Sequence, residues 1–251
     1  MNCIDINCDL GENYQDMIRT NDEALMPWVS SCNIACGFHG GDPLTMVNAL
    51  ALARKYDVKV GAHPSYPDRK NFGRVKMDLE EEVLCNYVIH QLNTLSEVAA
   101  SSGLELHHVK PHGALYNAAF DDALVARAIV DAVLEVDARL ALYCQPNSEL
   151  ERIGKSVGID TKAEGFGDRS YQANGRLTPR SETNAIWHQP EQVNQQVLQM
   201  VNEKSVEALD GHIIPMDVAT ICIHGDHKNS VNILQELDAF LKANNIKKGF
   251  Q

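Results

Sequence analysis

Ionisable side chains in this sequence recur in short segments that also contain glycine or proline. The segments include "NCDLGEN", "GFHGGDP", "GAHPSYPD", "VKPHGALYN" and "IHGDH". Their carboxylates, imidazoles and amines are groups that transfer protons, bind anions or ligate metal ions. Ordinary turns favour Asn, Ser and Gly, whereas these segments place charged groups beside a residue that permits or fixes an unusual backbone angle. The pattern therefore indicates a site for chemistry.

The ionisable residues of these segments, with those of the longer "GFGDRSYQANGRLTPR", define the candidate site. They are Asp9, Glu12, His39, Asp42, His63, Lys110, His112, Asp168, Arg169, Arg176, Arg180, His224 and Asp226. Taken singly, each His or Asp has an ordinary explanation as a loop cap or turn residue. Asp42, which is followed by Pro43, fits the N-cap of a helix. The functional interpretation therefore depends on recurrence.

The elements that must position these residues follow from the apolar pattern. Short apolar runs predict strands at residues 3–7, 32–36, 58–62, 106–110, 140–144, 161–166 and 220–224. Helical periodicity predicts helices at 43–53, 79–100, 121–136, 148–156, 190–203 and 228–243. This alternation predicts an α/β fold, with a parallel sheet closed into a barrel and one domain over residues 1–251. Six of the seven predicted strands are followed by ionisable residues, and parallel strands end on one face, so we expect one pocket.

Composition excludes several classes of function. The chain has 22 Lys and Arg residues against 34 Asp and Glu residues, a formal net charge of −12, and no basic run. Binding to nucleic acid or to an anionic membrane is therefore not expected. The N-terminal segment lacks the pattern of a signal peptide, and no apolar run approaches the ~20 residues of a membrane span, so we expect a cytoplasmic protein.

The 7 cysteines form no Cys-x-x-Cys pair. We expect reduced thiols that pack in the core, because most of them lie in or beside apolar strand segments. Cys32 and Cys36 would share one face of a strand, so a thiolate metal site there is the alternative.

In their order along the chain, the segments resemble the LamB/YcsF family, the A subunit of bacterial 5-oxoprolinase. The similarity runs from "DINCDLGE" through "NIACGFHGGDP", "GAHPSYPD", "VKPHGALYN" and "DRSYQANGRLTPRS" to "ICIHGD", which spans Asp5 to Asp226. The resemblance implies a seven-stranded parallel β/α barrel, TIM-like and of the glycoside hydrolase and deacetylase type. It also implies ATP-dependent opening of the lactam of 5-oxo-L-proline to L-glutamate, with ADP and phosphate as products, together with subunits B and C.

The implied reaction suggests roles for the strand-end residues. The candidates for catalysis are Asp9, Glu12, His39, His63, Lys110 and His112. The candidates for binding substrate or phosphate are Asp42, Asp168, Arg169, Arg176, Arg180, His224 and Asp226. Carboxylates and imidazoles would transfer protons, while Lys110 and the arginines would offset phosphate and carboxylate charge. ATP is expected as a co-substrate, although the chain has no phosphate-binding loop that would assign ATP to this subunit.

Two other functions remain open at this point. One is a metal-dependent amidase or deacetylase that needs no ATP, with Zn²⁺ held by Asp9, His39, His63 or His112. A divalent metal is thus an alternative, and the sequence does not decide which of these residues would hold it. The other is a non-catalytic subunit that binds substrate or stabilises its partners.

Overall fold

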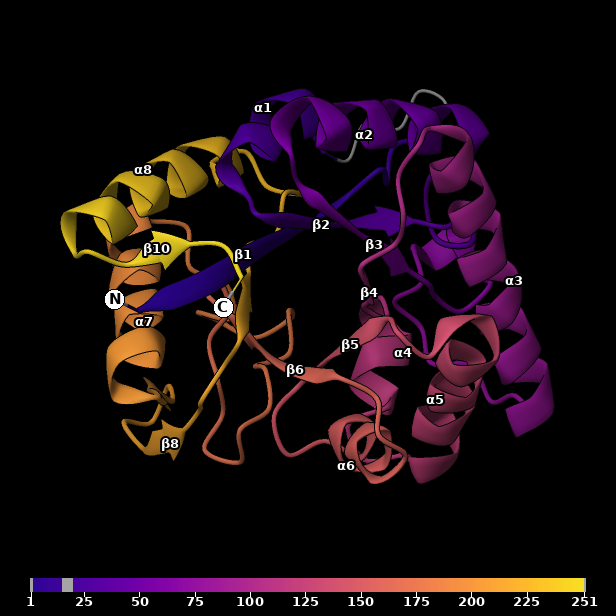
Figure 1. Cartoon of the computed structure of the whole chain (residues 1–251). Helices are drawn as coiled ribbons and strands as arrows, with labels where there is room; N and C mark the ends of the chain where they lie inside the picture. Colours follow the sequence, from indigo (N-terminus) through magenta and orange to yellow (C-terminus); the bar gives the residue numbers. More distant parts are fainter. Residues whose placement is uncertain (1, 15–19, 251) are drawn as a thin grey trace.

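The chain folds into a closed barrel of parallel strands surrounded by helices (Figure 1). The structure is a computed structural model that describes residues 2–14 and 20–250. Within these residues the barrel strands are β1 (Cys3–Leu10), β2 (Ser31–Ala35), β3 (Lys59–His63), β4 (His108–Val109), β5 (Ala141–Cys144), β6 (Thr161–Phe166) and β9 (Thr220–Cys222). They pair in this order, and β9 also pairs with β1, which closes the barrel. The predicted seven-stranded, TIM-like α/β barrel is confirmed.

Helices cover the outside of the barrel. They include α2 (Pro43–Tyr56), α3 (Glu81–Ser101), α5 (Ala123–Asp137), α6 (Glu149–Ser156), α7 (Pro190–Glu203) and α8 (Ser230–Ala243). In Figure 1, α3 packs beside α5 on one side of the barrel and α7 beside α8 on the other. These bounds agree with the predicted ones to within a few residues. No helix in the described part of the chain is long and apolar enough to span a bilayer.

Several short elements were beyond sequence prediction. They are α1 (Asp22–Leu25), η1 (Met26–Trp28), η2 (Arg69–Asn71), α4 (Gly113–Ala118), β7 (Ser205–Glu207), β8 (Ile213–Pro215) and β10 (Lys247–Lys248). Each is too short to show a periodic pattern. Strand β7 forms an antiparallel hairpin with β8, and β10 extends the sheet beside β1.

The barrel interior is polar, although such barrels usually fill with branched apolar side chains. Along β1, Asp5, Asn7 and Asp9 alternate with apolar residues, as the period of a strand requires. The Asp5 carboxylate accepts hydrogen bonds from Thr220 Oγ1 at 2.6 Å and from Tyr143 Oη, on the opposite wall, at 3.0 Å. The bottom of the barrel is therefore closed by a buried carboxylate whose oxygens are hydrogen-bonded.

A second polar layer lies above Asp5. Asn7 Nδ2 donates to Glu164 Oε1 at 2.9 Å, and Asn33 Nδ2 donates to Asn7 Oδ1 at 2.8 Å. His108 Nε2 lies 2.7 Å from Asn33 Oδ1, and its ring stacks on Tyr143 with 4.0 Å between centroids. These side chains form a buried network that supports the strand ends from below.

Candidate functional site

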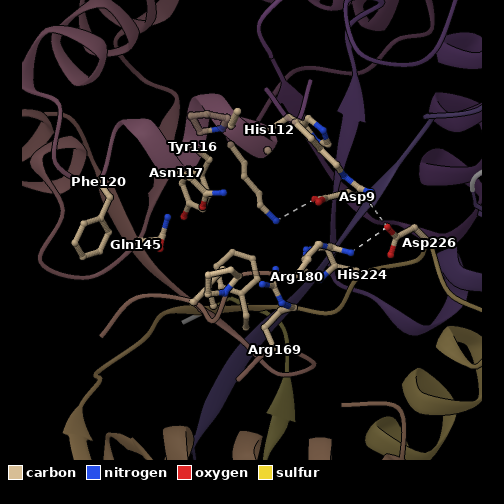
Figure 2. A pocket seen from close by; sticks show the side chains of 18 of the residues that line it. Asp9, His112, Tyr116, Asn117, Phe120, Gln145, Arg169, Arg180, His224 and Asp226 are labelled. Atoms are coloured by element: carbon tan, nitrogen blue, oxygen red, sulfur yellow. Dashed lines mark hydrogen bonds and ion pairs between the residues drawn. The ribbon is translucent and has the colours of Figure 1, made fainter. Parts of the chain in front are cut away.

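A pocket of about 430 Å³ opens at the carboxyl ends of the barrel strands. Its volume suits a small molecule. Ten of the thirteen predicted residues line it, namely Asp9, Glu12, His63, Lys110, His112, Arg169, Arg176, Arg180, His224 and Asp226. Figure 2 shows Asp9 and His224 across the pocket from Asn117 and Gln145. The barrel thus brings groups from distant parts of the sequence to one cavity.

Lys110 lies in the floor of the pocket and is only 1% exposed. Its Nζ is 2.9 Å from Asp9 Oδ1 and 3.0 Å from Glu164 Oε1, and it also donates to Asn7 Oδ1 and Cys222 Sγ. Burial disfavours the charged form of the amine and lowers its pKa. Electrostatic attraction to Asp9, Cys222 and Glu164 is larger than this effect, so the pKa of Lys110 lies well above its ordinary value. Lys110 is therefore a buried cation already paired with two carboxylates, which leaves less charge for a phosphate than we expected.

The backbone around Pro111 directs Lys110 and His112 to the same pocket. The Lys110 N–H donates to Ala62 O at 2.9 Å, and the His112 N–H donates to Pro64 O at 2.8 Å. These bonds keep the segment extended alongside the end of β3, and Pro111 needs no partner because it has no N–H. Helix α4 then begins at Gly113.

Three imidazoles pack together at the side of the floor. His63 Nδ1 lies 2.7 Å from Lys110 O, and His112 Nε2 lies 2.9 Å from Phe72 O. His63 Nε2 and His112 Nδ1 are 3.0 Å apart, while His39 stacks on His112 with 3.7 Å between centroids. Burial, with added repulsion from the neighbouring histidines, lowers the pKa of His39 and of His112 well below the ordinary value.

Two buried carboxylates meet these imidazoles. Asp9 Oδ2 is 3.3 Å from His63 Nε2, and Glu12 Oε1 is 3.2 Å from His39 Nε2 and 3.5 Å from His112 Nδ1. Burial and the charge of Asp9 raise the pKa of Glu12 to about 7. Burial opposes ionisation of Asp9 too, but positive charge on His63 and on the buried ammonium holds its pKa well below the ordinary value. Carboxylates with pKa values pushed apart are typical of acid–base sites.

The same groups could hold a metal ion. Glu12, His39, His63 and His112 each place one ligand atom within 4.8 Å of the others. Asp9, Cys222 and His224 do so as well. Cys32 and Cys36 are buried free thiols, and neither belongs to these groups.

Arginines form the rim of the pocket. Arg74 Nη2 is 2.8 Å from Asp226 Oδ2, and Arg180 Nη1 is 3.4 Å from the same oxygen. Two partly exposed guanidiniums thus share one carboxylate, so the rim keeps a net positive charge. Burial raises the pKa of Asp226, but His224 and the two arginines outweigh this effect and lower it.

The other two predicted arginines have local partners. Arg169 is buried, and its guanidinium donates to Thr178 O at 2.6 Å and to Ala185 O at 3.0 Å, so it holds the loop that walls the pocket. Burial and the charge of Arg180 lower the pKa of Arg169 to about 10. Arg176 forms an ion pair with Asp121 at the mouth.

Three predicted residues do not line the pocket. His39 lies behind Glu12 and His112. Asp42 caps α2, since its carboxylate accepts the Thr45 N–H at 2.8 Å. Asp168 accepts the backbone N–H of His224 at 2.9 Å and contacts its Nδ1 at 2.9 Å, so it fixes the ring that does line the pocket. Burial opposes ionisation of Asp168, yet the charge and hydrogen bonds of His224 lower its pKa to about 2.

Other lining residues were not among the predictions. They include Arg74, Tyr116, Asn117, Gln145 and Phe166. Arg74 lies in the polar loop between β3 and α3, and its charge was the available signal. Gln145 directly follows β5, and the end of that strand carries no ionisable group. A search for charged residues does not find a carboxamide. The position of Gln145 at a strand end was the available signal.

The fold and the pocket define a β/α-barrel protein with a cavity at the carboxyl ends of its strands. Its site combines buried carboxylates and imidazoles with exposed arginines. The chain belongs to the LamB/YcsF family, whose model matches residues 4–249.

Similar proteins and a similar crystal structure support this family assignment. The chain is 45% identical to the A subunit of 5-oxoprolinase from Bordetella parapertussis, over 97% of this chain and 96% of that protein. It is 43% identical to the A subunit of 5-oxoprolinase from Geobacillus thermodenitrificans, over 96% and 94% of the two chains. The crystal structure of a lactam utilization protein from Thermus thermophilus superposes with a TM-score of 0.94 at 38% identity, over 99% of this chain and 100% of that one.

Proposed function

We propose that this chain is a subunit of an ATP-dependent 5-oxoprolinase and that its pocket binds 5-oxo-L-proline. The reaction opens the lactam to L-glutamate, with cleavage of ATP to ADP and phosphate, and requires partner subunits B and C. The names of the relatives support this proposal. The observation that carries it is a small pocket that joins buried acid–base groups to a cationic rim.

The pocket matches the parts of this substrate. Arg74 and Arg180 can bind its carboxylate, because within the described residues they share one acidic partner. Phe166 and Tyr116 offer apolar surface to the ring. Gln145 is 6% exposed, and its carboxamide has no hydrogen-bond partner in the part of the chain that the structure describes, so it can hydrogen-bond the substrate from the wall opposite Asp9.

The floor supplies the proton transfers that lactam opening needs. Water adds to the carbonyl carbon and loses a proton, the C–N bond breaks, and the ring nitrogen gains a proton. Asp9, Glu12, His63 and His112 line the pocket and provide oxygen and nitrogen atoms that accept and return these protons. Lys110 holds Asp9 in place and keeps it ionised. ATP cleavage supplies the driving force that an unstrained amide lacks.

A reconstituted complex tests the proposal. The full chain is combined with subunits B and C, and glutamate release from 5-oxo-L-proline is measured with and without ATP. We expect Asp9→Asn to lower kcat by about 10²-fold or more, because it removes a proton-accepting group. Arg180→Gln should raise KM by about 10-fold or more through the loss of a charged hydrogen bond. Arg127→Gln is the matched control, since Arg127 lies on the outside in α5.

The outcomes separate the three functions. ATP-dependent turnover that falls in the Asp9 variant supports the proposal. Unchanged kcat in that variant favours a non-catalytic subunit. Amide hydrolysis by the isolated chain without ATP favours a metal-dependent amidase.

A further inference from the structure

Four acceptor atoms crowd together on the floor of the pocket. They are Asp9 Oδ2, Glu12 Oε1, His63 Nε2 and His112 Nδ1, which we call the acceptor cluster. His63 Nε2 lies 3.0 Å from His112 Nδ1, 3.3 Å from Asp9 Oδ2 and 4.0 Å from Glu12 Oε1. His112 Nδ1 lies 3.5 Å from Glu12 Oε1. All four residues line the cavity.

Backbone carbonyls fix the tautomers of both rings. A carbonyl oxygen only accepts, so the 2.7 Å contact to Lys110 O places a hydrogen on His63 Nδ1. The 2.9 Å contact to Phe72 O likewise places a hydrogen on His112 Nε2. In the neutral rings, His63 Nε2 and His112 Nδ1 therefore present bare lone pairs to each other at 3.0 Å. Two lone pairs at that separation repel unless something positive lies beside them.

The carboxylates are also held from behind. Asp9 Oδ1 accepts hydrogen bonds from Asn33 Nδ2 at 2.8 Å and from Lys110 Nζ at 2.9 Å, which leaves Oδ2 for the cluster. His39 Nε2 lies 3.2 Å from Glu12 Oε1 and is placed to donate to it. Protein metal sites show this arrangement, in which outer groups orient each ligand and fix each histidine tautomer.

We infer that Asp9, Glu12, His63 and His112 bind one divalent transition-metal ion, such as Zn²⁺, at the floor of the pocket. Ligand bonds of roughly 2.0–2.2 Å at tetrahedral angles put neighbouring ligand atoms roughly 3.3–3.6 Å apart. The four separations given above, which join His63 to the other three residues and His112 to Glu12, run from 3.0 to 4.0 Å and bracket this range. Two imidazoles with carboxylates suit Zn²⁺ and related ions better than Mg²⁺ or Ca²⁺.

This assignment differs from the metal alternative considered from the sequence. Glu12 becomes a ligand, whereas His39 orients Glu12 from outside the pocket lining. When bound, such an ion would have to accept a fifth ligand from the cavity in order to polarise a carbonyl or activate water. The inference deepens the proposed function because it concerns the same site, and with an ion bound these four residues would hold the ion in place of transferring protons themselves. Metal binding is measured without substrate and so is tested separately.

The test is metal binding by the full chain. The protein is stripped with EDTA, dialysed and titrated with Zn²⁺ by calorimetry and with Co²⁺ by visible absorption. We expect one equivalent of each ion and a Co²⁺ ligand-field spectrum. Glu12→Gln and His112→Ala should weaken Zn²⁺ binding by more than about 100-fold, and His39→Ala by about 10–100-fold. His212→Ala is the matched control, because His212 is exposed and lies outside the pocket.

Circular dichroism spectra and melting curves show that each variant is folded, and Glu12→Gln keeps the shape of the side chain. The absence of stoichiometric binding to the wild-type chain overturns the inference, as does wild-type affinity in Glu12→Gln. Either result leaves the lactam-opening proposal intact. Metal binding combined with an inactive complex supports the site and contradicts the proposed reaction.

Discussion

Replacement of Lys110 by methionine tests the electrostatic basis of the pocket floor. Methionine has a similar length but no charge, so Lys110→Met leaves Asp9 and Glu164 facing each other without the ammonium that now lies 2.9 and 3.0 Å from them. Removing one partner of a buried ion pair lowers the free energy of unfolding by about 3–5 kcal/mol. We expect a loss in this range.

The chain offers a matched surface pair as the control. Lys76 Nζ lies 2.9 Å from Asp122 Oδ2, the same separation as between Lys110 and Asp9. The Lys76 side chain is 58% exposed, against 2% for Lys110. Solvent screens the exposed pair, so Lys76→Met should change the free energy of unfolding by no more than about 1 kcal/mol.

Urea unfolding followed by circular dichroism measures both variants at pH 7. A double variant, Lys110→Met with Glu164→Gln, should lose less stability than Lys110→Met alone, because one of the unpaired carboxylates is gone. Equal losses in Lys110→Met and Lys76→Met would refute the reasoning. So would the lack of any recovery in the double variant.

Two further predictions concern residues near the pocket. Asp168→Asn should lower the free energy of unfolding by about 2–3 kcal/mol at pH 7, since the pKa of Asp168 is about 2 in the folded chain and about 3.9 when unfolded. This stabilisation is complete above the unfolded pKa and is lost as the pH falls toward 2, so urea titrations at pH 7 and pH 3 should show a smaller difference at pH 3. Gly61→Ala should destabilise the fold by about 1–3 kcal/mol in thermal unfolding, because the new Cβ would lie 2.1 Å from His108 Nε2. His108 stacks on Tyr143 and contacts Asn33, so it cannot easily move away from the new methyl group. A melting temperature equal to that of the wild-type chain would contradict this prediction.

The barrel was largely predictable because its signals are local. Apolar runs located all seven barrel strands, and helical periodicity located the main helices. Strand β4 shows the limit of this approach. Residues 106–110 were predicted, but only His108–Val109 form the strand, although the N–H groups of His107 and Lys110 still donate to β3.

The site was predictable only where charge marks a strand end. Asp9, His63 and Lys110 met in one pocket because parallel strands end on one face. Asp42 shows the opposite case, since its position after a strand is explained by capping α2. The polar interior was not predicted, because the strands were identified from their apolar content without assigning their two faces. The signal was present in β1, where Asp5, Asn7 and Asp9 alternate with apolar residues.

Contacts between distant loops could not be predicted. Arg74 and Asp226 are 152 residues apart in the sequence, and only the folded barrel shows that they pair. The same is true of the bonds that fix the tautomers of His63 and His112, which depend on carbonyl groups of other segments.

The polar barrel interior also affects how the stability of this protein should vary with temperature. Exposing apolar surface on unfolding raises the heat capacity, whereas exposing polar surface lowers it. Unfolding exposes the Asp5, Asn7 and Glu164 network together with the apolar layer between strands and helices. Relative to a barrel of the same size with an apolar interior, the heat-capacity change should be smaller. The stability curve should then be flatter, so this chain would lose less stability on cooling.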